Sequence, residues 1–180
     1  MKINRFYFLV VLILVLPLLG GFINADKQPK KESIQWLTLE EAAAKSQVAP
    51  RKILVDVYTD WCSWCRQMDK STFSDPKVVA YVNKNFYAVK LNAEDKAPIT
   101  INGKTYKFNS QYRAHEAAMA LLNGQLSYPT TVYLDEKMHI ITPVPGYLDV
   151  QDFSTILSYF GENHYKQQSF ADYSAIVSKK

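Results

Sequence analysis

"VDVYTDWCSWCRQMDK", residues Val55 to Lys70, contains the only two cysteines in a chain of 180 residues. Two residues separate Cys62 from Cys65, and a tryptophan precedes each cysteine, at Trp61 and Trp64. Three kinds of site use such a pair: a metal clip, a structural disulfide and a redox-active dithiol. The rest of the sequence decides between them.

The residues outside this stretch argue against a metal or haem site. A structural zinc ion needs four ligands, and the three histidines, His115, His139 and His164, are scattered without paired spacing. Haem attachment needs a histidine directly after the second cysteine, where this chain has Arg66. A disulfide that closes only two intervening residues removes little chain entropy. We therefore favour a redox dithiol, and we expect neither a metal nor another cofactor.

The local pattern around the cysteines supports this interpretation. "KILVDVYT", residues 52–59, is a short β-branched apolar run, typical of a strand that is buried on both faces. The cysteines follow after a short loop, at the start of a helix predicted over Arg66 to Lys70. The N–H groups and the dipole at such a helix start stabilise a thiolate.

The remaining pattern alternates strands with helices and ends in an antiparallel pair, which indicates an α/β sheet of mixed direction. The other expected elements are a helix capped by Thr38 and Glu41, a helix capped by Ser74 or Asp75 with Pro76 in its first turn, a strand over 87–91, a hairpin around Asn102-Gly103, a helix over 110–124, two strands around a turn at 135–137, a loop over 143–146, a helix over 149–161 and a short helix over 170–178.

Several motifs together resemble the thioredoxin-like superfamily. "ILVDVYTDWCSWC" resembles its active-site strand and turn, including the spacing from Asp56 to the first cysteine, and "VKLN" resembles the next strand. "YPT", residues 128–130, resembles the cis-proline signature, and Gly146 fits the position after the final hairpin. "TFSDPKV" is similar to the C-terminal thioredoxin-like domain of bacterial transmembrane disulfide reductases and to exported thioredoxin-like proteins.

The resemblance covers roughly Trp36 to Phe160, apart from an insert at residues 93–125. It implies an α/β thioredoxin-like fold with a central mixed sheet of four to five strands. Helices would flank this sheet, and the insert would precede the cis-proline strand.

The resemblance also implies catalytic roles for four residues. Cys62 would be the outer cysteine and the nucleophile that attacks a substrate disulfide. Cys65, more buried, would resolve the mixed disulfide. Asp56 would lie buried beneath the sulfurs with a raised pKa and exchange the proton of Cys65, and Lys90 would tune Asp56.

Five further residues would bind the substrate. Pro129 in cis would place the backbone of Tyr128 beside the nucleophilic sulfur, where an extended substrate can pair with it. Trp61, Ser63 and Trp64 would surround the same sulfur. The residues alone also allow simpler interpretations, in which Trp61 and Trp64 only pack against their neighbours.

Simpler interpretations exist for other residues as well. Asp56 could be a residue at a strand end, Lys90 an exposed strand lysine and Pro129 a trans proline in a turn. His115, within the insert, could reach the dithiol, although we expect a surface residue on a helix.

The dipeptide between the cysteines bears on the direction of electron flow. Thioredoxins carry Gly-Pro where this chain has Ser63-Trp64, and the pair lacks the histidine that is typical of strong oxidants. We therefore expect a thiol–disulfide oxidoreductase that acts as a reductase. A disulfide oxidase or isomerase, and a non-catalytic binding or chaperone-like module, are the alternatives.

The N-terminus has the pattern of a targeting segment. Lys2 and Arg5 precede Phe6 to Phe22, 17 residues without a charge, and Ala25 could precede a cleavage site. We favour a cleaved signal peptide, with an uncleaved membrane anchor as the alternative; either implies export. We expect a periplasmic protein, with a secreted or a membrane-anchored protein as the alternatives. The expected organisation is residues 1–25 as signal or anchor, 26–33 as linker, 34–162 as thioredoxin-like domain and 163–180 as C-terminal extension.

Charge and chemistry indicate the class of partner. The formal net charge is +4, and it falls to +2 without Lys2 and Arg5. No basic stripe stands out, so nucleic acid is not an expected partner. We expect protein disulfides as substrates and a membrane-bound electron donor. Contact with the membrane would occur only through an uncleaved N-terminal segment.

Overall fold

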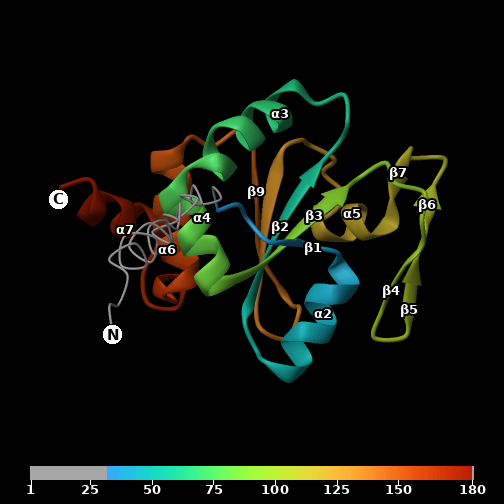
Figure 1. Cartoon of the computed structure of the whole chain (residues 1–180), viewed down its shortest axis with the longest axis horizontal. Helices are drawn as coiled ribbons and strands as arrows, with labels where there is room; N and C mark the ends of the chain where they lie inside the picture. The colour runs from blue at the N-terminus through green and yellow to red at the C-terminus, as the bar shows by residue number, and fades with distance from the viewer. Residues whose placement is uncertain (1–31, 180) are drawn as a thin grey trace, which may run out of the picture. The chain divides into compact units, whose positions relative to one another are not determined.

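A mixed five-stranded sheet forms the centre of the computed structural model, which describes residues 32–179 (Figure 1). The predicted signal or anchor, and nearly all of the predicted linker, lie outside these residues. The strand order is β1-β3-β2-β8-β9. Strands β1, β3 and β2 run parallel to one another, β8 runs antiparallel to β2, and β9 runs antiparallel to β8. The strands are β1 (Trp36–Leu37), β2 (Lys52–Tyr58), β3 (Phe86–Asn92), β8 (Thr130–Leu134) and β9 (Ile140–Pro145). The predicted mixed sheet is confirmed.

Helices cover both faces of this sheet, so each face of β2 is buried against a separate core. One core contains Leu54 and side chains from α3, α4, α6 and α7, and the other contains Ile53, Val55 and Val57 with side chains from α2 and α5. The helices are α2 (Leu39–Val48), α3 (Ser63–Lys70), α4 (Pro76–Asn85), α5 (Glu116–Leu121), α6 (Val150–Gly161) and α7 (Phe170–Val177), with 3-10 turns η1 (Thr72–Ser74) and η2 (His164–Lys166). Burial on both sides explains why β2 is an apolar run apart from Lys52 at its start and Asp56.

Two predicted helix starts have the expected caps. Thr38 Oγ1 accepts the backbone N–H of Glu41, and the Glu41 carboxylate accepts that of Thr38, which completes a capping box at α2. Asp75, rather than Ser74, caps α4, with Pro76 in its first turn. Within residues 32–179, no helix has both the length and the apolar character needed to cross a membrane.

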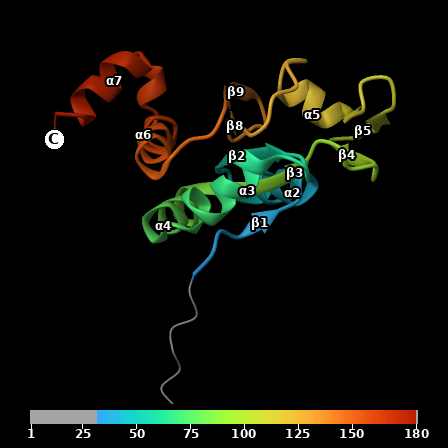
Figure 2. The same cartoon turned by 90° about the horizontal axis from the view of Figure 1, so that it is seen from above.

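The insert begins with the predicted hairpin. Strands β4 (Ile99–Ile101) and β5 (Lys104–Tyr106) pair antiparallel around Asn102 and Gly103. Both turn residues have positive φ, 51° and 78°, as a type I′ turn requires. This hairpin projects at the side of the molecule away from α7 (Figures 1 and 2).

The predicted helix over residues 110–124 is wrong at its start, whereas Gly124 closes its end as predicted, with a φ of 78° and its N–H donating to the carbonyl of Met119. Residues Phe108–Asn109 (β6) and Ala114–His115 (β7) pair antiparallel around a turn in which Arg113 has a φ of 52°. The helix is therefore confined to α5, Glu116–Leu121. A further difference is that β9 extends through Pro143 and Pro145, which were expected in a loop. An edge strand tolerates prolines because one side of its ladder needs no N–H donor.

His115 is fully buried, which contradicts the expectation of a surface position or a role at the dithiol. Its Nδ1 accepts the backbone N–H of Ala117 and so caps α5. Its Nε2 lies 3.1 Å from the carbonyl of Ala97 and donates to it, since Nδ1 is already the acceptor. The histidine is therefore a structural link between the two ends of the insert.

Substitution of His115 by alanine should destabilise the fold. It removes two hydrogen bonds, leaves the buried N–H of Ala117 without its partner and empties a fully buried site, so we expect a loss of about 2–4 kcal/mol. Urea unfolding followed by circular dichroism measures this loss. His139→Ala is the matched control, because that side chain is 74% exposed, and it should change stability by less than about 1 kcal/mol. Equal effects in both variants would contradict the structural role.

Candidate active site

Cys62 and Cys65 form a disulfide at the start of α3, with their Cα atoms 5.3 Å apart. Cys62 is the N-cap of this helix, and its sulfur lies 3.1 Å from the backbone nitrogen of Cys65, whose N–H points to it. A thiolate at this position would receive the same N–H and the favourable end of the helix dipole. The two residues are 4% and 3% exposed, so both cysteines are buried to nearly the same extent in the disulfide form.

Asp56 lies in the middle of the sheet, in the row that joins Lys90 of β3 to Thr131 of β8. It alternates with Val55 and Val57 and so shares the face of Leu54, which is covered by α3. Its Oδ2 accepts a hydrogen bond of 2.6 Å from Lys90, whereas its buried Oδ1 has no partner among the described residues. Burial raises the pKa of the Asp56 carboxyl, and the ammonium of Lys90 opposes this rise without cancelling it.

Lys90 connects Asp56 to the helix that carries the cysteines. Its Nζ also donates to the carboxylate of Asp69, in the last turn of α3. Burial lowers the pKa of Lys90, but the two carboxylates outweigh burial and raise it above its usual value. The ammonium therefore stays charged, and the interpretation of Lys90 as an exposed strand lysine is wrong.

Aromatic rings enclose the same ammonium. The Nζ of Lys90 lies 4.9 to 5.3 Å from the ring centres of Trp36, Tyr58 and Phe73. Sequence analysis did not identify Asp69 as part of this cluster. Its position one helical turn after Cys65 was the available signal, because residues four apart lie on one face of a helix.

Two exposed tryptophans flank the disulfide. Trp61 makes an edge-to-face contact with Tyr128, with ring centres 6.0 Å apart. Trp64 packs against Tyr147 at 5.3 Å. Sequence analysis had not identified Tyr147, whereas Trp61, Trp64 and Tyr128 do come together as expected at this edge of the sheet. The first residue of α3, Ser63, is exposed between the two tryptophans in the sequence.

The Tyr128-Pro129 peptide bond is cis, directly before β8. The carbonyl of Pro129 accepts the N–H of Gly146 at 2.8 Å, which ties this loop to the end of β9. Gly146 has a φ of 98°, a conformation that favours glycine. Burial raises the pKa of the Tyr128 phenol, and the nearby carboxylate of Glu94 raises it further. The loop is therefore fixed next to Trp61 on one side and close to Glu94 on the other.

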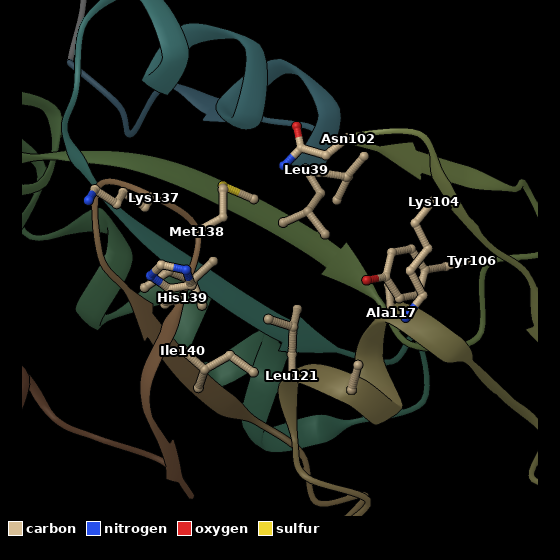
Figure 3. A pocket seen from close by; sticks show the side chains of 13 residues that line it. Leu39, Asn102, Lys104, Tyr106, Ala117, Leu121, Lys137, Met138, His139 and Ile140 are labelled. Carbon is tan, nitrogen blue, oxygen red and sulfur yellow. The ribbon is translucent and has the colours of Figure 1, made fainter.

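Figure 3 shows a separate, mainly apolar cavity of about 380 Å³. Leu134, at the far end of β8 from Pro129, lines it together with Leu39 of α2 and Leu121 of α5. Leu134 pairs with Ile53 near the start of β2, whereas the cysteine loop follows the end of that strand. This cavity is therefore not part of the dithiol site.

The fold and the dithiol agree with comparisons to known proteins. A sequence profile described as "Thioredoxin-like domain" matches residues 39–161, more than half of the chain. The chain belongs to the thioredoxin-like domain family. The matched residues contain the dithiol, Asp56, Lys90 and the cis-proline loop, and thus every predicted site residue of this thioredoxin-like protein.

Curated relatives of this thioredoxin-like protein include thiol:disulfide interchange proteins. It is 28% identical over 124 residues to "Thiol:disulfide interchange protein DsbD" of Pectobacterium atrosepticum, a match that covers 68% of this chain and 18% of the relative. The protein of the same name from Escherichia coli K12 is 26% identical over 141 residues, which covers 77% of this chain and 22% of the relative. The chain therefore spans less than a quarter of the length of these relatives.

Solved structures share the fold of this thioredoxin-like protein at low sequence identity. A thioredoxin from Thermus thermophilus superposes with a TM-score of 0.53 and 22% identity, covering 76% of this chain and 99% of that one. A protein described as "DsbH Oxidoreductase" gives a TM-score of 0.53 at 14% identity, covering 77% and 92%. These likenesses support the thioredoxin-like fold.

Proposed function

We propose that the protein is a thiol–disulfide oxidoreductase that reduces disulfides of other proteins through Cys62 and Cys65. The observation that carries this proposal is the position of Cys62, whose sulfur receives the N–H of Cys65 at the start of α3. The same contact would stabilise a thiolate and favour Cys62 as the attacking group. Its curated relatives are named as thiol:disulfide interchange proteins, which supports the same chemistry.

The reaction would proceed in two exchanges. The Cys62 thiolate attacks one sulfur of the substrate disulfide, forms a mixed disulfide with it and releases the other sulfur as a thiolate. Cys65 then loses its proton and attacks Cys62, which forms the Cys62–Cys65 disulfide and releases the second substrate thiolate. Two electrons pass to the substrate, and an external dithiol donor must return two electrons to the protein.

Asp56 would take the proton from Cys65 in the second exchange. Its raised pKa makes the carboxylate a better base than an ordinary aspartate. Lys90, which pairs with both Asp56 and Asp69, would favour the ionised form of Asp56 at neutral pH, the form that can accept a proton. Trp61, Ser63, Trp64, Tyr128 and Pro129 would form the surface that receives the substrate chain.

We further propose that the protein is exported to the periplasm and receives its electrons from a membrane-bound donor. The apolar run Phe6 to Phe22 after Lys2 and Arg5 supports export. Ser63-Trp64, without a histidine, supports the reductase direction. A measured reduction potential near that of strong oxidants, about −120 mV, would instead favour an oxidase.

Reduction of insulin tests the proposed activity. With dithiothreitol as electron source, the protein should accelerate the precipitation of insulin chains well above the rate with dithiothreitol alone, because each turnover cleaves a protein disulfide. The turbidity of the solution records the precipitation. His139→Ala, distant from the dithiol, should behave as the wild type. No acceleration by protein whose cysteines are shown to be reduced at the start would contradict the proposal.

A further inference from the structure

A groove of about 460 Å³ lies beside the dithiol, and the insert supplies one of its walls. Trp61, which directly precedes the nucleophile, and Tyr128, which precedes the cis proline, form the wall nearest to the dithiol. Tyr112 and Arg113 belong to the turn between β6 and β7, within the insert. The groove is lined by Trp61, Glu94, Tyr112, Arg113, Leu126 and Tyr128.

The insert's wall is fixed by hydrogen bonds to the core of the domain. Asn109 Oδ1 accepts the backbone N–H of Tyr112 at 3.2 Å, and this hydrogen bond stabilises the turn that carries Tyr112. The N–H of His115 donates to the carbonyl of Ala93, and the N–H of Ala93 donates to that of Tyr58, the last residue of β2. The turn is thus anchored to the strand end from which the cysteine loop departs, so its position relative to Cys62 is set by the fold.

The chemistry of the groove is mainly aromatic. Trp61 is 66% and Tyr112 is 56% exposed, so both rings are available to a bound group, and Tyr128 packs edge-to-face on Trp61. One carboxylate, Glu94, and one guanidinium, Arg113, lie at the same groove, and neither forms an ion pair with another described residue. Because the two charges are opposite, the groove has no strong preference for the charge of its occupant. Its rings instead favour a large apolar or aromatic side chain.

The position of the groove identifies the occupant. It begins at the residue before Cys62 and runs along the residue before the cis proline, so a chain that pairs with the cis-proline loop while its disulfide reaches Cys62 lies beside this groove. We propose that this groove binds the polypeptide segment next to the substrate's cysteine and selects a large apolar or aromatic side chain there. The inference rests on the proposed function and makes Tyr112, from the insert, a specificity-determining residue.

Peptide disulfides test the selection. One set carries a single Trp at each position within two residues of the cysteine, and the parent peptide carries Gly at all of these positions. We expect the wild type to prefer the best Trp peptide over the parent by about 3- to 10-fold in kcat/KM, the range that one aromatic contact supplies. Tyr112→Ala should reduce this ratio towards one, and Tyr112→Phe, which keeps the ring, should retain it. Val48→Ala, on an exposed residue at the end of α2, is the control outside the groove and should also retain it.

A small aromatic disulfide, 5,5′-dithiobis(2-nitrobenzoic acid), separates the two proposals. If the wild type reduces neither this compound nor any peptide, the proposed function fails, and the selection fails with it. If the wild type reduces the compound but handles all peptides equally, only the selection is overturned. The same conclusion follows if folded Tyr112→Ala, checked by its melting temperature, keeps the full preference for Trp.

Discussion

Replacement of Cys65 by serine is expected to convert the protein into a covalent trap for its substrates. The Cys62 thiolate would still attack a substrate disulfide, because the helix start that stabilises it is unchanged. Without the second thiol no intramolecular attack releases the substrate, so the mixed disulfide persists. Turnover of insulin should fall by at least about 10³-fold. Non-reducing electrophoresis and mass spectrometry of the trapped species measure the result.

Cys62→Ser is the matched control for the trap. It removes the proposed nucleophile and keeps a small polar side chain at the N-cap, so the fold should persist while both turnover and trapping disappear. Mixed disulfides that form equally well with Cys62→Ser would show that Cys65 attacks first. That result would reverse the roles proposed for the two cysteines.

The parts of the fold that short-range pattern encodes were predictable from the sequence. β2 is an apolar run because both of its faces are buried, and the caps of α2 and α4 are local contacts between residues two or three apart. The hairpin at Asn102-Gly103 follows from turn residues that accept positive φ. In each case the residues that determine the structure are neighbours in the chain.

The errors lie where contacts distant in sequence determine the structure. The helix predicted over residues 110–124 fails because the N–H of His115 pairs with Ala93, 22 positions earlier in the chain. The burial of His115 has the same origin, since its ring bonds to Ala97. Asp69 meets Lys90 across 21 positions, and Tyr147 meets Trp64 only after β9 folds back. The spacing of four residues from Cys65 places Asp69 on one face of α3, but no local pattern identifies the distant partner in any of these contacts.

The second large effect is expected from Asp56→Asn, which should slow the release of substrate at neutral pH. If Asp56 accepts the proton of Cys65, its loss should lower kcat/KM by about 10²-fold near pH 7. The defect should shrink as pH rises past about 8.5, the usual pKa of a thiol, because Cys65 then ionises without a base. Insulin reduction measured between about pH 6 and 9.5 tests this dependence. Asp152→Asn, an exposed aspartate on α6, should keep the wild-type profile.

The same substitution should stabilise the fold at neutral pH, because the folded protein raises the pKa of Asp56 by burial. A carboxyl whose pKa is raised by folding stabilises the native state at pH values below about 3.9, which is its pKa in the unfolded chain. This stabilisation is lost as the pH rises through the pKa of the carboxyl in the folded protein. At pH 7.5 the wild type therefore carries a buried charge that asparagine removes. Lys90 keeps Asp69 as its partner, so its charge stays compensated in the variant.

We expect Asp56→Asn to gain about 1–2 kcal/mol of unfolding free energy at pH 7.5, and this gain should disappear as pH falls to about 4. Urea unfolding at both values measures the difference, with Asp152→Asn again as control. A variant that is slower in turnover yet more stable would show that Asp56 contributes to catalysis and at the same time lowers the stability of the fold. A variant that is slower and less stable at pH 7.5 would mean that the ion pair with Lys90 outweighs the cost of burial, and Asp56 would then act through the fold rather than on the proton.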